Sequence, residues 1–292
     1  MAQRLHRARI GLLAGGLLAM LFALVTAAET PPPAQAAYVE VPDARLWFTD
    51  TGGRGAPVIF LHANTGSSRV WEYQRSALVA RGFRVIAYDR RGFGRTLVTP
   101  GAPPATGADD LLALADSLKL GRFHLVGTAA GGFVAYDFAL SFPKRLRSLV
   151  VANSIGGAQD PEFLELIRRL QPAPFASLPA DVRELGPSYR AANPKGVEQW
   201  AELERTHLAP GAPLPAQPMR NRITFAALAK IAVPALLLTG GADLYAPPPV
   251  MQQFASQIKG AKFVVVPEAG HSTYWEQPDA FNREVLAFIA RH

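Results

Sequence analysis

Short apolar runs alternate with longer amphipathic stretches along most of the chain. The apolar runs contain few polar residues, which is typical of strands buried on both faces, as in a parallel sheet covered by helices. Six such strands are predicted, at 58–61, 85–88, 123–126, 149–151, 235–238 and 263–266. Helical spacing of apolar residues is found between them, at 70–81, 109–120, 132–142, 248–258 and 278–291. The alternation predicts an α/β fold with a doubly wound, mostly parallel sheet.

Residues 160–222 interrupt this alternation. The interval contains many prolines and several short helical pieces, but no convincing buried strand. Apolar residues such as Phe163, Tyr189 and Trp200 give these pieces faces to bury. We therefore expect a mostly helical cap at 160–222, inserted into a core formed by residues 37–159 and 223–292.

The first 36 residues have the layout of a secretory signal peptide followed by a Pro-rich leader. Three arginines precede an apolar run, and small residues follow it. Cleavage sites are present at Thr26-Ala27-Ala28 and at Ala34-Gln35-Ala36, and the sequence does not choose between them. The predicted location is therefore periplasmic or secreted, with no membrane span left after cleavage. The alternative is a membrane anchor at residues 10–28, a stretch close to the roughly 20 residues that a spanning helix needs.

The composition excludes several classes of site. Of the 292 residues, 49% are hydrophobic and 18% are charged, which is ordinary for a folded protein. The chain has no cysteine, so disulfides, thiolate metal sites and a cysteine nucleophile are excluded. Removal of residues 1–36 takes away three arginines and one glutamate, which lowers the net charge from +7 to +5. No basic run indicates nucleic-acid binding.

A strand-to-helix turn carries the most informative motif. The predicted strand at 123–126 leads into Gly127-Thr128-Ala129-Ala130-Gly131, and a predicted helix follows at once. This arrangement resembles the Gly-x-Ser-x-Gly nucleophile elbow of the α/β-hydrolase superfamily. The resemblance covers essentially the whole chain after the leader and implies the α/β-hydrolase fold with a cap. Ala129, however, occupies the position of the nucleophilic serine, and a methyl group cannot attack a carbonyl.

The same resemblance assigns the two partners of the missing nucleophile. Asp243 follows the predicted strand at 235–238, and His271 follows the strand at 263–266. The chain order of elbow, acid and histidine is the order of this superfamily. Both residues lie just beyond the carboxyl ends of strands, where open α/β sheets bind ligands. Asp243 would orient the imidazole and stabilise its charged form, while His271 would take up and return a proton.

An oxyanion hole is implied by the segment from Leu61 to Gly66, where relatives often read His-Gly-x-Pro-Gly. By resemblance, the backbone N–H groups of Asn64 and Ala130 would face a developing negative charge. Ala63 and Thr65 replace the glycine and the proline of that pattern. His62 is predicted to be structural.

Other residues complete the predicted site. The segment 89–95 resembles the superfamily's Asp-x-x-Gly-x-Gly loop, and we expect it to brace its neighbours. Aromatic residues are expected to line an apolar substrate pocket, namely Trp71, Phe133, Trp200 and Tyr245. No cluster has metal-ligand spacing, so neither a metal nor a cofactor is expected. The expected partner is a small-molecule substrate, and the oligomeric state is left open.

Alanine at the nucleophile position leaves three functional interpretations. The chain is a serine esterase or related hydrolase inactivated by Ser→Ala at position 129, an enzyme that uses the His271–Asp243 dyad as a general base without a covalent intermediate, or a non-catalytic ligand-binding pseudo-hydrolase. Retention of both dyad residues disfavours the third. The departures at Ala63 and Thr65 indicate natural divergence and favour the second. We therefore expect an enzyme that acts on a small carbonyl or ester compound.

Export makes a direct prediction about the mature N-terminus. Expression in a secreting host should give a protein that begins between Glu29 and Tyr38, because both cleavage sites fall before or within this range. Intact-mass spectrometry of the exported protein measures the start. Recovery of the full or merely Met-trimmed chain from the membrane fraction would instead favour the anchor.

Overall fold

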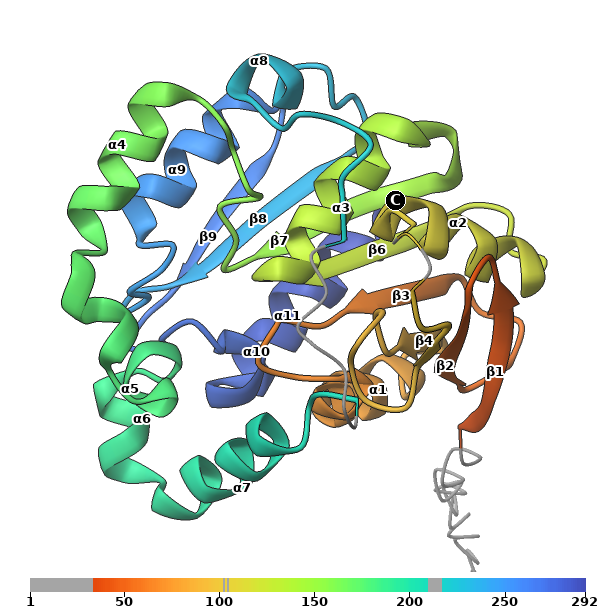
Figure 1. Ribbon diagram of the computed structural model, residues 1–292, viewed down its shortest axis with the longest axis horizontal. Helices are drawn as coiled ribbons and strands as arrows, with labels where there is room; N and C mark the ends of the chain where they lie inside the picture. Colours follow the sequence, from red (N-terminus) through yellow and green to blue (C-terminus); the bar gives the residue numbers. More distant parts are fainter. Residues whose placement is uncertain (1–33, 102, 104, 210–216) are drawn as a thin grey trace, which may run out of the picture. The chain divides into compact units, whose positions relative to one another are not determined.

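The computed structural model describes residues 34–101, 103, 105–209 and 217–292. Within these residues, nine strands form one sheet in the order β1-β2-β4-β3-β6-β7-β8-β9, with β5 paired to β2 (Figure 1). Pairing is parallel from β4 to β9 and antiparallel among β1, β2, β4 and β5. The strands are β1 (Gln35–Val41), β2 (Ala44–Asp50), β3 (Pro57–Leu61), β4 (Arg84–Tyr88), β5 (Leu97–Val98), β6 (Phe123–Thr128), β7 (Leu146–Ala152), β8 (Ala235–Gly240) and β9 (Lys262–Val266). The doubly wound, mostly parallel sheet that the sequence predicts is confirmed.

Helices cover both faces of this sheet. The α-helices are α1 (Glu72–Val79), α2 (Gly107–Ser117), α3 (Ala130–Ser141), α4 (Pro161–Leu170), α5 (Ala180–Glu184), α6 (Pro187–Ala192), α7 (Pro194–Arg205), α8 (Phe225–Leu228), α9 (Pro248–Gln257), α10 (Thr273–Glu276) and α11 (Pro278–Ile289). Short 3-10 helices are η1 (Ser68–Trp71), η2 (Pro143–Arg145) and η3 (Ala173–Ser177). Side chains of α2, α3 and α9 contribute to one apolar cluster, and those of α1 and α11 to the other.

The strand β3 shows why the central strands read as continuous apolar runs. Ile59 and Leu61 belong to the first apolar cluster, whereas Val58 and Phe60 belong to the second. Successive side chains of a strand point to opposite faces, so a strand with helices on both sides is mostly apolar. All six predicted strands form, and β9, at the edge of the sheet, is less buried than the others.

The antiparallel edge of the sheet was not predicted. Strands β1 and β2 form a hairpin in which Val41 pairs with Ala44. Most of β1 is exposed or half-buried, and β2 alternates between buried and more exposed residues. These two strands therefore lack the continuous apolar character that identifies the central ones. β1 begins at Gln35, inside the predicted leader.

The described part of residues 160–222 contains α4 to α7 and η3 up to Arg205 and no regular strand, and residues 206–209 and 217–222 are not helical. An isolated bridge joins Leu208 to Phe93. The predicted signal peptide and the alternative anchor fall on residues 1–33, outside the described residues. None of the described helices has the length and apolar character that a membrane span requires.

A buried ion pair attaches the loop that follows β4 to the helix α2. The guanidinium of Arg91 donates to Asp110 at 2.7 and 2.8 Å and to the carbonyl of Pro42 at 2.6 Å. Both charged side chains are only 2% exposed. Loss of one member of such a pair leaves the other charge buried without compensation.

Asp110→Asn should therefore lower the free energy of unfolding by about 3 kcal/mol, the lower end of the cost of breaking a buried pair. Urea unfolding of the protein measures the loss. Asp116→Asn is the matched control. Asp116 also forms an ion pair, with Arg145, but its side chain is 58% exposed. The control should change stability by about 0.5 kcal/mol or less, and equal losses for both variants would contradict a special role of the buried pair.

Candidate active site

The turn between β6 and α3 has the backbone of a nucleophile elbow. Ala129 has φ 48° and ψ −118°, a conformation that is costly for a residue with a side chain. A Cβ on Gly127 would clash with the carbonyl of Gly131, and a Cβ on Gly131 would clash with the carbonyl of Leu61. The two glycines therefore let the helix start close to the strands. The strained geometry that presents a nucleophile persists although position 129 carries only a methyl group.

Neighbouring groups hold this turn in place. The amide of Ala129 donates to the carbonyl of Ala152 at 3.0 Å, and the hydroxyl of Ser154 donates to the carbonyl of Ala129. Ser154 follows strand β7, directly after Asn153. Sequence reasoning missed both residues, because a serine and an asparagine after a strand carry no motif of their own.

Asp243 and His271 form the predicted pair. Nδ1 of His271 lies 2.9 and 3.0 Å from the two carboxylate oxygens of Asp243. The backbone amides of Tyr245 and Ala246 donate to Asp243 at 2.8 and 2.9 Å, and Nδ2 of Asn153 donates at 2.9 Å. Every contact to the carboxylate comes from a donor, which favours its ionised form.

The pKa values follow from these contacts. Burial acts to raise the pKa of Asp243, but the charge on His271 and the hydrogen bonds outweigh it, so the pKa is lowered. Burial acts to lower the pKa of His271, but the carboxylates of Asp243 and Glu184 outweigh it and raise the pKa to about 9. His271 therefore carries a proton on both ring nitrogens at neutral pH in the ligand-free protein.

Two glutamates that the sequence analysis did not select surround the histidine loop. Glu184, at the end of α5, is 5% exposed, and its carbonyl accepts from the amide of Ser272 at 3.0 Å. Burial raises the pKa of its carboxyl, against the charge of His271. Glu276 accepts from the amides of Gly186 at 2.7 Å and Gly270 at 2.9 Å. Burial raises its pKa to about 7. Glu276 thus clamps the segment after α5 to the loop that carries His271.

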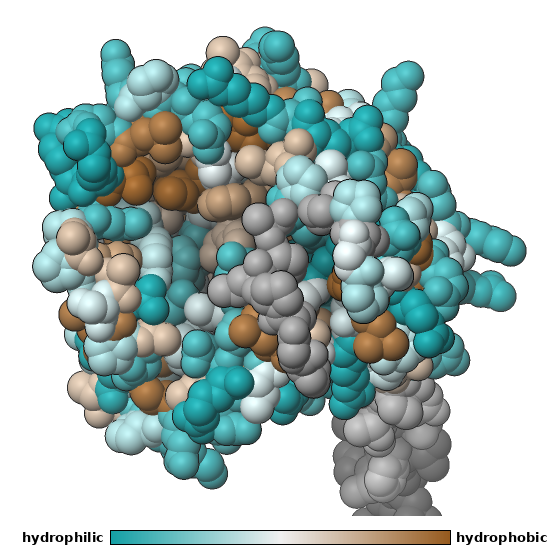
Figure 2. Space-filling model, in the orientation of Figure 1, coloured by the Kyte–Doolittle hydropathy of each residue, from teal (hydrophilic) through white to brown (hydrophobic). Residues whose placement is uncertain are grey.

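A cavity of about 320 Å³ contains most of the predicted site. It is lined by the predicted residues Asn64, Ala129, Ala130, Phe133, Tyr245 and His271, and also by Ala63, Thr65, Asn153, Ser154, Ile155, Gln171, Arg183, Glu184 and Ala246. Figure 2 shows a hollow on this face, between the region of α4 to α6 and the carboxyl ends of the strands. Asp243 lies behind His271, with its side chain fully buried.

Two of the predicted pocket residues lie elsewhere, so their assignment to this cavity is wrong. Trp71 is 1% exposed and stacks between Phe60 and Tyr274 at centroid distances of 4.8 Å. Trp200 on α7 is 2% exposed and belongs to the same apolar cluster. Large aromatic side chains bury most area in the core, and sequence alone does not separate core aromatics from pocket aromatics.

The side chain of His62 supports the predicted oxyanion loop through two hydrogen bonds. Nδ1 of His62 donates to the carbonyl of Ala63 at 2.7 Å, and its Nε2 accepts from the amide of Arg90 at 3.0 Å. Burial and the charge of Arg90 hold the pKa of His62 well below its usual value, so this ring is neutral. Because His62 links the amide of Arg90 to the carbonyl of Ala63, its contacts fit a structural role. Asn64 and Ala130 both line the cavity, and the amide of Ala130 is at the first turn of α3, where no intrahelical acceptor exists.

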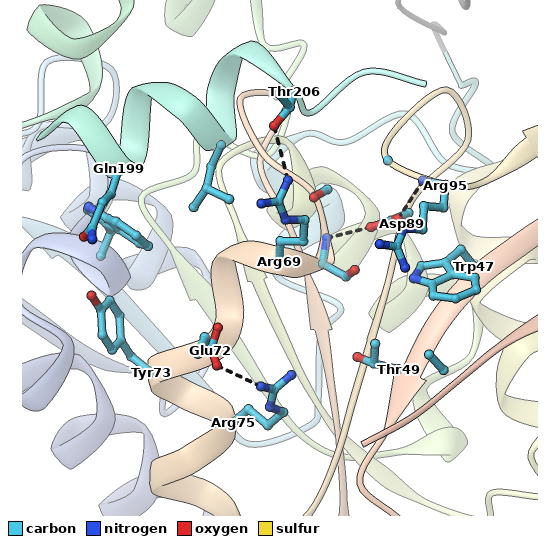
Figure 3. A pocket seen from close by; sticks show the side chains of 16 residues that line it. Trp47, Thr49, Arg69, Glu72, Tyr73, Arg75, Asp89, Arg95, Gln199 and Thr206 are labelled. Atoms are coloured by element: carbon cyan, nitrogen blue, oxygen red, sulfur yellow. Dashed lines mark hydrogen bonds and ion pairs between the residues drawn. The ribbon is translucent and has the colours of Figure 1, made fainter. Parts of the chain in front are cut away.

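A larger cavity of about 540 Å³ lies away from this chemistry (Figure 3). Its walls come from β2, η1, α1 and α7 and include Trp47, Arg69, Arg75 and Arg95. Arg75 is paired with Glu72, and Arg95 lies over the ring of Trp47. Neither Ala129 nor His271 reaches it, so the smaller cavity is the candidate active site. No cluster of metal-binding side chains occurs in the described part of the chain.

Comparison with known proteins identifies relatives. The model of the Alpha/beta hydrolase family matches residues 58–284. A 2-hydroxy-6-oxononadienedioate/2-hydroxy-6-oxononatrienedioate hydrolase of Burkholderia vietnamiensis is 29% identical over 268 residues, covering 85% of this chain and 92% of that protein. A thermophilic esterase from Thermogutta terrifontis, solved with malate bound, has a TM-score of 0.73 and 30% identity, covering 88% and 99%. The enol-lactonase from Burkholderia xenovorans LB400 shares the fold, with a TM-score of 0.72 at 24% identity and coverage of 87% and 100%.

The position of Glu184 predicts a change in the titration of His271. Glu184→Gln keeps the side-chain shape but removes a negative charge that raises the pKa of His271, so the midpoint should fall below about 9. Titration of the imidazole by ¹⁵N NMR measures it. Glu198→Gln, on the exposed side of α7, is the control and should leave the midpoint unchanged. A midpoint that is the same in both variants would mean that Glu184 does not act on the histidine.

Proposed function

Because the chain belongs to the α/β-hydrolase family, and because its candidate site joins a histidine–aspartate pair to an elbow without a nucleophile, we propose that it acts on a small carbonyl or ester compound by general base catalysis. The observation that carries the proposal is that His271, Ala129, Asn64 and Ala130 line one cavity. No covalent acyl-enzyme forms at position 129 in this mechanism.

The reaction proceeds by proton transfer. Neutral His271 takes a proton from a carbon next to the carbonyl, or from a water molecule that attacks it. The amides of Asn64 and Ala130 stabilise the negative charge that develops on the carbonyl oxygen. Asp243 holds the ring through Nδ1, so Nε2 is the nitrogen that exchanges the proton. Since the pKa of His271 is about 9 in the ligand-free protein, turnover should rise with pH toward that value.

The relatives support this class of substrate. One is named as a hydrolase of an unsaturated oxo-dicarboxylate and another as an esterase. A carbonyl group is the reactive centre in both kinds of compound, and the cavity of about 320 Å³ suits small substrates.

Residues 160–222 are proposed to act as the cap of this site. Gln171, which follows α4, and Arg183 and Glu184, which end α5, line the cavity with His271. The interval therefore supplies one wall of the pocket, including the carboxyl of Glu184. We also propose export of the protein, from the signal-like leader in the sequence.

The second candidate is a serine esterase inactivated by Ser→Ala at position 129. The strained φ of 48° at Ala129 favours it, because this geometry serves to present a serine hydroxyl. A ligand-binding protein without catalysis is the remaining alternative, and the buried, fully paired Asp243–His271 arrangement argues against it.

Two single variants and their combination distinguish these functions. In an inactivated esterase, Ala129→Ser should raise hydrolysis of activated esters such as p-nitrophenyl acetate by orders of magnitude, because loss of a triad member can cost on the order of 10⁶ in turnover. In the proposed enzyme, the gain should be small. His271→Ala should abolish native turnover, because it removes the base.

The double variant Ala129→Ser with His271→Ala is the control for a restored triad, because a genuine gain needs the histidine. A large esterase gain in Ala129→Ser that disappears in the double variant would replace the proposed function with the inactivated esterase. Turnover that survives His271→Ala would exclude both enzymatic mechanisms.

A further inference from the structure

Adjacent arginines after β4 have opposite electrostatic surroundings. Arg91 is neutralised by Asp110. Arg90 is also buried, at 7% exposure, but no carboxylate lies within ion-pair distance of it among the described residues. Residues 102, 104 and 210–216, which lie outside that description, include no acidic residue, and residues 1–33 include Glu29. Among the described residues, Arg90 is therefore a buried cation without a carboxylate partner.

The contacts of Arg90 leave part of its guanidinium unused. Nη2 donates to Oδ1 of Asn64 at 2.6 Å, and the guanidinium lies 4.7 Å from the ring centre of Phe93. The buried Nε has no hydrogen-bond acceptor in the described structure. A buried guanidinium with an unused donor is costly unless an anion completes its surroundings. Burial lowers the pKa of Arg90 to about 10, so the group stays charged at neutral pH.

Arg90 lines a chamber beside the candidate active site. Arg90 lines a cavity of about 170 Å³ together with Gly107, Val134, Asp137, Gln217, Pro218 and Met219. The chamber shares Asn64, Ala130 and Phe133 with the cavity of His271. The positive end of the α3 helix, at Ala130, opens onto both.

Asp137, the acidic residue among those that line the chamber, accepts hydrogen bonds from other residues. Asp137 accepts from the amides of Arg220 and Asn221 at 2.8 and 2.9 Å and from Nδ2 of Asn221 at 2.7 Å. The carboxylate of Asp137 is therefore hydrogen-bonded to residues 220–221 and does not pair with Arg90. His62, which also contacts this loop, is neutral. The chamber thus has a positive end beside the predicted oxyanion hole.

We propose that Arg90 binds a carboxylate group of the substrate, so that the enzyme selects small carbonyl compounds that carry a carboxylate. A planar carboxylate matches the parallel N–H donors of a guanidinium. The chamber holds the carboxylate with a few carbons, and the carbonyl of the same molecule then lies near Asn64 and Ala130. This inference rests on the proposed function for the position of the carbonyl only, because carboxylate binding needs no turnover.

The test compares 4-oxopentanoate with its neutral analogue 4-oxopentanamide by isothermal titration calorimetry. The two probes have the same carbonyl and nearly the same shape, so a difference in affinity reports the carboxylate. The wild-type protein should bind the carboxylate at least about 10-fold more tightly, which corresponds to one charge-assisted hydrogen bond. Arg90→Met should bring the ratio of the two affinities close to one; because it also removes the hydrogen bond to Asn64, the ratio and not either single affinity is the measure.

Three further variants make the outcome unambiguous. Arg90→Lys keeps the charge and should retain a weakened preference, which covers the case in which Arg90→Met does not fold. Arg69→Met, in the separate cavity of Figure 3, should bind both probes like the wild type. Arg183→Met tests the arginine that lines the His271 cavity itself, and it should keep the preference for the carboxylate.

Equal affinity of the wild type for the two probes would overturn the proposal. So would a preference that survives Arg90→Met and disappears in Arg183→Met. His271→Asn separates this inference from the proposed function: the carboxylate preference should persist in it, whatever its effect on turnover. A preference for the carboxylate in an enzyme whose turnover does not need His271 would leave this inference intact and reject the proposed mechanism.

Discussion

The buried carboxylate of Asp243 organises the candidate active site. It receives hydrogen bonds from His271 after β9, from Asn153 after β7 and from two amides of its own loop after β8. Three parallel strands therefore end at one negative charge. Its ionised form satisfies all of these donors at once, whereas a neutral side chain would leave some of them unpaired in the interior. The position of the imidazole, and with it the wall of the cavity, depends on this charge.

The site also has an unusual balance of charge. Three carboxyl groups, those of Asp243, Glu184 and Glu276, surround one histidine, and the protons are shared among coupled groups. On the other side of the cavity, the unpaired Arg90 and the first turn of α3 provide positive potential. A substrate anion would thus lie away from the acidic side. This polarity orients a small molecule before any chemistry takes place.

The sequence predicts the parts of this molecule that depend on local pattern. The strands β3, β4 and β6 to β9 are apolar runs in the sequence, and all six were predicted. Ala129, Asp243 and His271 occupy motif positions, which is why the sequence selects them as candidate site residues. The edge strands β1 and β2 have mixed exposure and no comparable signal. Glu184 was missed because tertiary packing brings it to His271 from 87 positions away in the chain. Trp71 was misassigned because its burial depends on Tyr274, which is distant in sequence.

The clamp formed by Glu276 has a consequence for how this scaffold diversifies. It joins the segment after α5 to the loop of His271, through Gly186 and Gly270, so Glu184 and the imidazole move as one body. We therefore expect insertions or deletions elsewhere in residues 160–222 to alter the entrance of the cavity more than the spacing between Glu184 and His271.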